Sequence, residues 1–227
     1  MRKLYDLCTA DRDVRLSPPC WVAKFALMHK DLDFETVPLG FTEKDKLPDP
    51  EYGRFPILDD DGDIVRDSMT IVSYLEEKHP EKPLFETKHA QASASFYQAY
   101  LGAHLFPSLA PLMFIRVHDA LNDDNKSYFR ESREKRFGVT LEALAAQDGL
   151  SEKTEAALAT LVAPLSEHAF YGGDSPNLCD YVVAGPFMWK HALTDEHLFE
   201  TPKEFAAWFE RILDLFDGYA RKAPRAA

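Results

Sequence analysis

A serine and a cysteine lie three residues apart at the predicted start of a helix, in Leu16-Ser17-Pro18-Pro19-Cys20-Trp21. Proline is well tolerated in the first helical turn, so Ser17 is suited to cap this helix. The same position offers a second role, because a helix N-terminus has free N–H groups and partial positive charge. A thiolate lying there would be stabilised and would accept a hydrogen bond from the Ser17 hydroxyl. The sequence is compatible with both roles of Ser17, helix capping and thiolate stabilisation.

The spacing Ser17-x-x-Cys20 also matches a redox C-x-x-C motif whose first, nucleophilic cysteine is replaced. Cys20 has no local partner for a disulfide, but its thiolate, if stabilised, would react with an external disulfide. The alternative is an inert thiol buried in the first helical turn.

A second group of candidate residues lies in Arg54-Phe55-Pro56-Ile57-Leu58 and in Asp67-Ser68. Proline does not donate to a sheet ladder, so Pro56 marks a strand's first residue, an edge or a turn. It is also a candidate cis peptide bond, which would present neighbouring backbone groups to a ligand. Asp67 and Ser68 put a carboxylate and a hydroxyl at a helix start near that strand. Together these residues predict a site for a small zwitterionic peptide; alternatively, Ser68 caps the helix and Asp67 complements its dipole.

The elements that must position these residues alternate over the first 80 residues. We expect strands and helices, in chain order, at Lys3–Cys8 (strand), Pro18–Lys30 (helix), Asp33–Pro38 (strand), Phe55–Asp59 (strand), Asp63–Arg66 (strand) and Ser68–His79 (helix). The first β-α-β unit favours parallel pairing, and the Asp61-Gly62 turn makes the last two strands antiparallel. Residues 1–80 are therefore predicted to form a small α/β domain with a mixed four-stranded sheet.

After a linker at 81–87, residues 88–227 are predicted to be an all-helical domain. Helical patterns cover Lys88–Ala120, Asn125–Gln147, Ser151–Glu167, Leu178–Leu193 and Pro202–Lys222. Pro107 and Pro111 should kink or break the first of these. Asn177 and Asp180 have the spacing of a capping box, a structural feature at the start of a central helix. Most aromatic residues here belong to the core, and a few are expected to line an apolar pocket, from the set Tyr97, Tyr100, Phe106, Phe114 and Trp189.

Composition limits the class of protein. Hydrophobic residues make up 45% of the 227 residues and charged residues 28%, as in ordinary soluble proteins, and the net charge of −12 argues against nucleic-acid binding. Three cysteines without framework spacing fit free thiols in a reducing cytoplasm, and no Cys and His cluster has zinc-like spacing. We expect no membrane span, since no run approaches ~20 apolar residues, and no signal peptide, since Asp6 interrupts the N-terminal segment.

The pattern as a whole resembles the cytosolic glutathione transferases, a thioredoxin-like domain followed by an all-helical one. Arg54-Phe55-Pro56-Ile57-Leu58 is similar to the family's x-[VF]-P-[VI]-L strand with its cis proline, and Asp67-Ser68 to its acidic-Ser pair. The segment from Ile71 to Pro80 resembles the I-x-x-Y-L-x-x-x-[YH]-P continuation, and Asn177 to Asp180 the family's capping box. The resemblance covers essentially the whole chain.

Within this family, Ser17 to Lys30 is similar to the β-etherase-related branch, which carries Ser-Pro-x-x-Trp-x-x-K-x-x-L-x-x-K and cleaves aryl ethers. The resemblance implies one role for each site residue. Ser17 would activate the thiol, and Phe55 would pair with the glutathione backbone beside cis-Pro56. Asp67 and Ser68 would bind the γ-glutamyl end, and Arg54 would contact the tripeptide.

The expected protein is a cytoplasmic, homodimeric glutathione transferase acting in detoxification. Glutathione is its co-substrate and a small hydrophobic electrophile its acceptor, with aryl-ether cleavage as one candidate reaction and no metal. The alternatives are a non-catalytic glutathione-binding or interaction protein of the same fold, and a thiol transferase based on Cys20. One departure from the family is the long, charged loop Thr9 to Leu16, which is expected to reshape the mouth of the site or to move Ser17.

Overall fold

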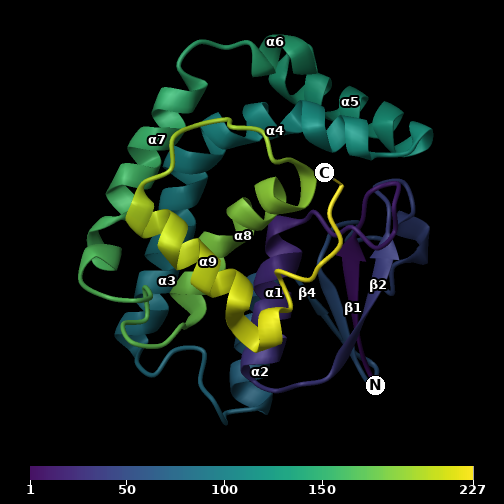
Figure 1. Ribbon diagram of the computed structural model, residues 1–227. Coiled ribbons are helices and arrows are strands. Elements are labelled where there is room, and N and C mark those ends of the chain that lie inside the picture. Colours follow the sequence, from purple (N-terminus) through teal and green to yellow (C-terminus); the bar gives the residue numbers. More distant parts are fainter. Residues whose placement is uncertain (227) are drawn as a thin grey trace.

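A mixed sheet with two helices forms the first part of the chain in the computed structural model, which describes residues 1–226 (Figure 1). The strands are β1 (Arg2–Leu7), β2 (Phe34–Leu39), β3 (Ile57–Asp60) and β4 (Asp63–Arg66). They lie in the order β2-β1-β3-β4, with β1 parallel to β2 and β3 antiparallel to both β1 and β4. The thioredoxin-like α/β fold expected from the sequence is confirmed.

The two faces of the sheet are covered by different apolar clusters, because successive strand residues point to opposite faces. Leu58 belongs to the main core with the helices α1 (Pro18–His29) and α2 (Ser68–Lys78), whereas its neighbour Ile57 packs with Leu39 and Leu47. Leu47 follows a short 3₁₀ turn, η1 (Lys44–Lys46).

A buried ion pair fixes α1 against β1. Lys24 Nζ lies 2.7 Å from Asp6 Oδ2 and 3.7 Å from the centre of the Trp21 ring, and both charged side chains are at most 1% exposed. Burial lowers the pKa of Lys24, while the Asp6 carboxylate raises it. Because a lone charge is costly to bury, each partner needs the other.

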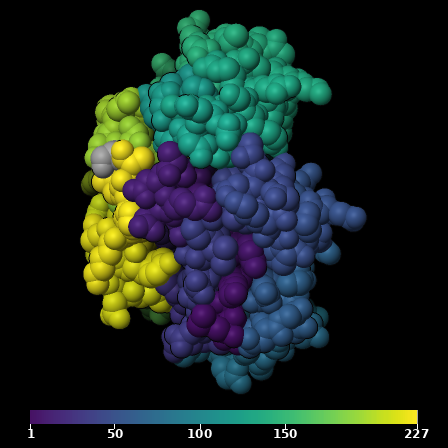
Figure 2. All heavy atoms as spheres, turned by 90° about the vertical axis from the view of Figure 1, so that its right-hand side faces the viewer, coloured from purple at the N-terminus to yellow at the C-terminus, as the bar shows by residue number. Residues whose placement is uncertain are grey.

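Helices form the rest of the described chain, apart from an isolated bridge between Phe170 and Gly173. They are α3 (Lys88–Tyr100), the π-helical η2 (Leu101–Leu105), α4 (Phe106–Ala120), α5 (Asp123–Phe137), α6 (Leu141–Ala145), α7 (Leu150–Leu161), the 3₁₀ turn η3 (Ala163–Ser166), α8 (Leu178–Leu193) and α9 (Lys203–Gly218). The central α8 packs against α1, α3 and α4 (Figure 1). Seen from the sheet side, the teal segment containing α5 lies directly above the purple and blue N-terminal part (Figure 2). The all-helical second half is confirmed.

Local signals explain most helix ends. Asn177 and Asp180 form the expected capping box at the start of α8. Gly138, at φ 75°, ends α5 at Phe137, so the helix expected over Asn125–Gln147 is divided into α5 and α6. The helix expected over Pro202–Lys222 ends earlier, because Leu215–Asp217 leave helical geometry inside α9.

The segment Lys88–Ala120 was expected to kink or break at Pro107 and Pro111. Pro107 instead occupies the first turn of α4, and Pro111 lies within this helix. The irregularity comes earlier, in the π-helical turn of Leu101–Leu105.

By length and composition alone, the continuous run Lys88–Ala120 could cross a membrane, since an 18-residue window has a mean hydropathy of 1.2. The core helix of a globular domain meets the same criterion. In this fold 44% of that window is buried, and the run packs against α7 and α8.

Candidate functional site

The loop before α1 returns the chain to the end of β1. Thr9 N–H donates to Val14 O at 3.1 Å, and Leu16 N–H donates to Leu7 O at 3.3 Å. The loop is also tied to the helical domain, because Ala10 N–H donates to the last carbonyl of α4 at 2.9 Å. This closed hairpin delivers Ser17 next to the end of β1 despite the extra length of Thr9 to Leu16.

Ser17 precedes α1 but does not cap it through its side chain, which accepts no hydrogen bond from the helix. The residue is only 6% exposed, and its hydroxyl acts on the neighbouring Cys20 thiol instead of on the helix backbone. Pro18 and Pro19 occupy the first two helical positions and have no N–H groups. The expected row of free N–H donors at this helix start is thus reduced, and Cys20 supplies the first one.

Cys20 lies beneath Ser17 with its side chain fully buried. Burial raises the pKa of the Cys20 thiol well above its ordinary value, and the Asp6 charge raises it further, while Ser17 lowers it by less. A neutral, shielded thiol is a poor nucleophile. This environment argues against the alternative in which Cys20 attacks an external disulfide, and fits the inert buried thiol.

The Phe55–Pro56 peptide bond is cis, as the sequence predicted, and lies at the entrance to β3. Pro56 O accepts a hydrogen bond of 3.1 Å from Asp67 N–H, which joins this turn to the start of α2. Phe55 lies just before β3, and in the described residues 1–226 its backbone N–H and C=O form no hydrogen bond to another backbone group. Its N–H and C=O are consequently open to an extended peptide running alongside.

Asp67, rather than Ser68, caps α2, which corrects one interpretation of this pair. Its Oδ1 accepts from Met69 N–H at 2.9 Å and from Thr70 N–H at 3.4 Å. Asp67 has φ 68° and ψ 140°, a conformation that residues other than glycine rarely adopt. Such strain persists where the surroundings impose it, often at ligand sites. Ser68 is the first helical residue and is buried.

Arg54 is exposed, and in the described chain it makes no ion pair. Its charge acts on Tyr52, a residue that the sequence analysis did not consider. Burial raises the pKa of Tyr52, the Asp67 charge raises it further, and Arg54 lowers it. The charges of Arg54 and Asp67 therefore both act on the Tyr52 hydroxyl.

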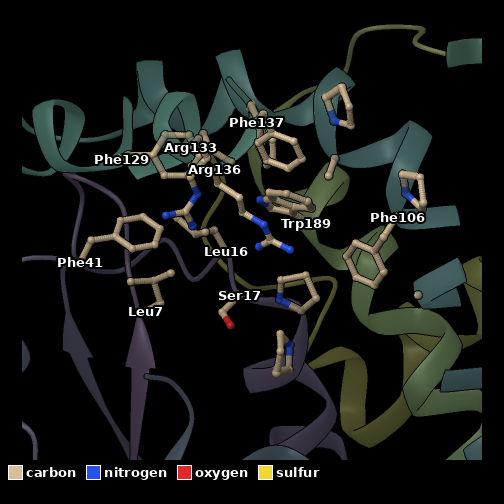
Figure 3. A pocket seen from close by; sticks show the side chains of 18 residues that line it. Leu7, Leu16, Ser17, Phe41, Phe106, Phe129, Arg133, Arg136, Phe137 and Trp189 are labelled. Carbon is tan, nitrogen blue, oxygen red and sulfur yellow. The ribbon is translucent and has the colours of Figure 1, made fainter. Parts of the chain in front are cut away.

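Two cavities meet at the start of α1. The smaller, of about 90 Å³, is lined by Pro18 and Pro19 together with Ser68 and Met69, so the starts of α1 and α2 converge. The larger, of about 540 Å³, lies where α1 faces the helical domain and has Ser17 on its wall (Figure 3). Pro18, Pro19 and Phe106 line both, so they form a shared wall.

The larger cavity, the interdomain pocket, is mostly apolar. Three of the five aromatic residues considered from sequence line it, namely Phe106, Phe114 and Trp189. Tyr97 and Tyr100 do not; Tyr100 instead donates to Ala157 O at 2.9 Å inside the helical domain. Its size suits a small organic ligand.

Four pocket residues from α5 were missed by the sequence analysis: Phe129, Arg133, Arg136 and Phe137. Their spacing of i, i+4, i+7 and i+8 places them on one helix face. Two arginines between two phenylalanines on one face of this helix were the available signal. Phe41, from the segment after β2, adds an aromatic wall from the first domain.

Comparison with known proteins identifies the family of this architecture. Residues 13–83 match the family model for the glutathione S-transferase N-terminal domain, and residues 92–216 match the one for the glutathione S-transferase C-terminal domain.

Relatives include a zeta-class glutathione S-transferase of Euphorbia esula, 31% identical over 100 residues, which are 41% of this chain and 43% of that one. Glutathione S-transferase 1 of Dianthus caryophyllus is 32% identical over 139 residues, 57% of this chain and 61% of that one. The alignments thus span about half the length of these curated relatives.

Among solved structures, a glutathione S-transferase of Ceriporiopsis subvermispora in complex with glutathione has a TM-score of 0.80 at 20% identity, covering 96% of this chain and 99% of that one. A glutathione transferase of Phanerochaete chrysosporium has a TM-score of 0.76 at 20% identity, covering 96% and 92%. These structures share the fold, and the two matched models together account for most of the sequence. The chain belongs to the glutathione S-transferase family.

Proposed function

We propose that this protein is a glutathione-dependent transferase in which the glutathione thiolate attacks an electrophilic carbon of a hydrophobic acceptor. One observation carries the proposal: Ser17, whose hydroxyl does not cap α1, lies on the wall of the interdomain pocket at the helix start that also meets the start of α2. Bound glutathione in a structurally similar protein of Ceriporiopsis subvermispora supports glutathione as the co-substrate.

Each part of the tripeptide has a suitable counterpart. The open backbone of Phe55 beside cis-Pro56 is suited to pair with the cysteinyl unit in an extended conformation. Asp67 offers a carboxylate to the α-ammonium of the γ-glutamyl group, and Ser68 offers a hydroxyl and the first N–H of α2 to its α-carboxylate. Arg54 supplies a positive charge near Asp67 for the remaining negative charge of the peptide.

Ser17 would then donate its hydroxyl hydrogen to the glutathione sulfur. This hydrogen bond favours the thiolate over the thiol and lowers the thiol pKa toward neutral pH. The thiolate forms a C–S bond to the acceptor held in the interdomain pocket, and the leaving group departs with the bonding electron pair.

The test is Ser17→Ala, with Ser73→Ala on the exposed side of α2 as the matched control. A hydrogen bond to a charged group contributes about 1.5–3 kcal/mol, so its loss should raise the bound thiol pKa by about 1–2 units and lower turnover at neutral pH at least about tenfold. The bound thiol is titrated by its ultraviolet thiolate absorbance, and glutathione affinity by calorimetry. Affinity should change by less than about twofold. Equal losses of affinity and turnover, or unchanged turnover, would contradict the role of Ser17.

A non-catalytic glutathione-binding protein is the competing function. Retention on immobilised glutathione without thiol conjugation across a panel of electrophiles would favour it. If the wild-type protein reduces disulfides and the Cys20→Ser variant does not, that result would favour the Cys20-based thiol transferase.

Aryl-ether cleavage is the most specific proposal, and it depends on the resemblance of Ser17 to Lys30 to the β-etherase-related branch. Its assay is release of a phenol from a β-aryl ether in the presence of glutathione. The homodimer, the cytoplasmic location and the detoxification role stay predictions; analytical ultracentrifugation tests the first.

A further inference from the structure

The interdomain pocket contains two guanidinium groups without a carboxylate partner. Arg133 and Arg136 extend from α5 into the pocket, toward Leu16 and Ser17 (Figure 3). Among residues 1–226, no acidic side chain lines this pocket, and neither arginine forms an ion pair. In a chain with a net charge of −12, such a positive, otherwise apolar pocket needs an explanation.

A third arginine on the same helix, by contrast, forms ion pairs with two carboxylates. Arg130 contacts Glu134 at 2.9 Å and Glu142 at 2.8 Å, outside the pocket. Arg133 is more buried and is left without such a partner. Burial lowers the pKa of Arg133, and the nearby charge of Arg136 lowers it as well. An anion in the pocket would relieve both the desolvation and the repulsion.

Aromatic stacking accounts for only part of this arrangement. The guanidinium carbon of Arg133 lies 4.4 Å from the Phe129 ring centre and 5.3 Å from that of Phe41, so it also joins the two domains. Stacking uses the faces of the guanidinium plane and leaves its N–H edge free. One N–H group of Arg133 donates a hydrogen bond to Ser132 Oγ at 2.8 Å, and the others are available to a ligand.

We propose that the acceptor bound in the interdomain pocket is an aromatic carboxylate, whose ring packs between Phe106, Phe114 and Trp189 and whose carboxylate accepts hydrogen bonds from Arg133 and Arg136. The inference rests on the proposed function in taking this pocket as the acceptor site. The cavity of about 540 Å³ is large enough for a substituted aromatic ring. Recognition by a guanidinium pair selects the acid over a neutral compound of equal shape.

Binding of an unreactive matched pair, 2-naphthoate and 2-naphthamide, tests the proposal without relying on thiol chemistry. Affinities are measured by calorimetry and by quenching of tryptophan fluorescence. The second method is suitable because Trp189 lines the pocket. We expect wild type to bind the acid at least about tenfold more tightly than the amide. The double variant Arg133→Gln/Arg136→Gln should lose this preference, whereas Lys135→Gln, which removes one charge from the same helix outside the pocket lining, should keep it.

Two further measurements separate the alternatives. Arg133→Lys keeps the charge but weakens stacking, so it should retain a clear preference for the acid if Arg133 binds anions. Equal affinities for acid and amide in wild type, no binding of either, or a preference that survives in the double variant would overturn the proposal. So would a double variant that loses glutathione affinity and keeps its naphthoate affinity, because the arginines would then serve the tripeptide. Failure of the proposed function has a different signature: naphthoate preference persists while no electrophile is conjugated.

Discussion

Asp67 combines a structural and a binding role that substitutions can separate. It caps α2 through hydrogen bonds to Met69 and Thr70, it has φ 68°, and its carboxylate is proposed to hold the α-ammonium of glutathione. Asparagine retains the side-chain acceptor, tolerates positive φ and removes the charge. Asp67→Asn should therefore change the free energy of unfolding by less than about 0.5 kcal/mol. Because the site is exposed, removal of the charge should cost at most about 1 kcal/mol, so glutathione affinity should fall up to about fivefold.

Glycine and alanine complete the series at Asp67. Backbone strain at such a position costs about 1–3 kcal/mol, and glycine removes this strain. Against this gain, replacing the cap by glycine costs about a few tenths of a kcal/mol, and the greater entropy of the unfolded chain costs up to about 1 kcal/mol. The net expectation for Asp67→Gly is a stabilisation of about 1 kcal/mol. Asp67→Ala keeps the strain and loses the cap, so it should destabilise by about 1 kcal/mol.

The assays are urea denaturation for stability and calorimetry for glutathione. The expected order of stability is Gly, then Asp and Asn together, then Ala, and all three variants should bind glutathione more weakly than wild type. Wild-type affinity in Asp67→Asn would show that the carboxylate does not pair with the α-ammonium. A glycine variant no more stable than the alanine variant would refute the backbone argument.

Three other features give independent tests. Asp6→Asn should cost about 3–5 kcal/mol, because it leaves the buried Lys24 ammonium without its carboxylate. Lys24→Met should cost less, because Arg15 Nε stays 3.7 Å from Asp6 Oδ2, and the double variant should cost much less than the sum in urea denaturation. Burial lowers the pKa of His29 in the folded state, so stability should decline as pH falls below the unfolded value of about 6.5; denaturation midpoints of His29→Gln should show a weaker decline over that range. At Gly185 an added Cβ would lie 2.9 Å from Pro18 O, so Gly185→Ala should separate α8 from α1, cost about 1–3 kcal/mol and lower turnover, whereas Ala184→Gly should lower stability but leave α1 in place.

Several elements in both domains could be predicted from sequence because their signals are local. The Asp61-Gly62 turn fixes β4 at Asp63–Arg66, the range expected from the sequence. The capping box likewise fixes the start of α8 at Leu178. A proline before an apolar strand was enough to indicate the cis bond at Phe55–Pro56. In each case the residues that determine the geometry are neighbours in the chain.

Features that depend on distant contacts were not predictable in the same way. Asp67 rather than Ser68 caps α2 because Pro56 O holds the Asp67 N–H, a bond between separate segments. The pocket requires α5 to lie above Ser17 and Phe41, and no local pattern gives that placement. Arg133 and Arg136 between Phe129 and Phe137 were visible in the sequence, but their role depended on knowing what this helix face contacts.

The two prolines at the start of α1 change how much the proposed activation depends on Ser17. A helix start normally offers several unpaired N–H groups to an anion. Here the first two positions have none, and Trp21 N–H is already bonded to Ser17 O at 3.1 Å. The N–H of Cys20 is left, together with the hydroxyl of Ser17, which does not cap the helix. A thiolate at this position can therefore rely little on backbone donors of α1, and the Ser17 hydroxyl should supply most of its stabilisation.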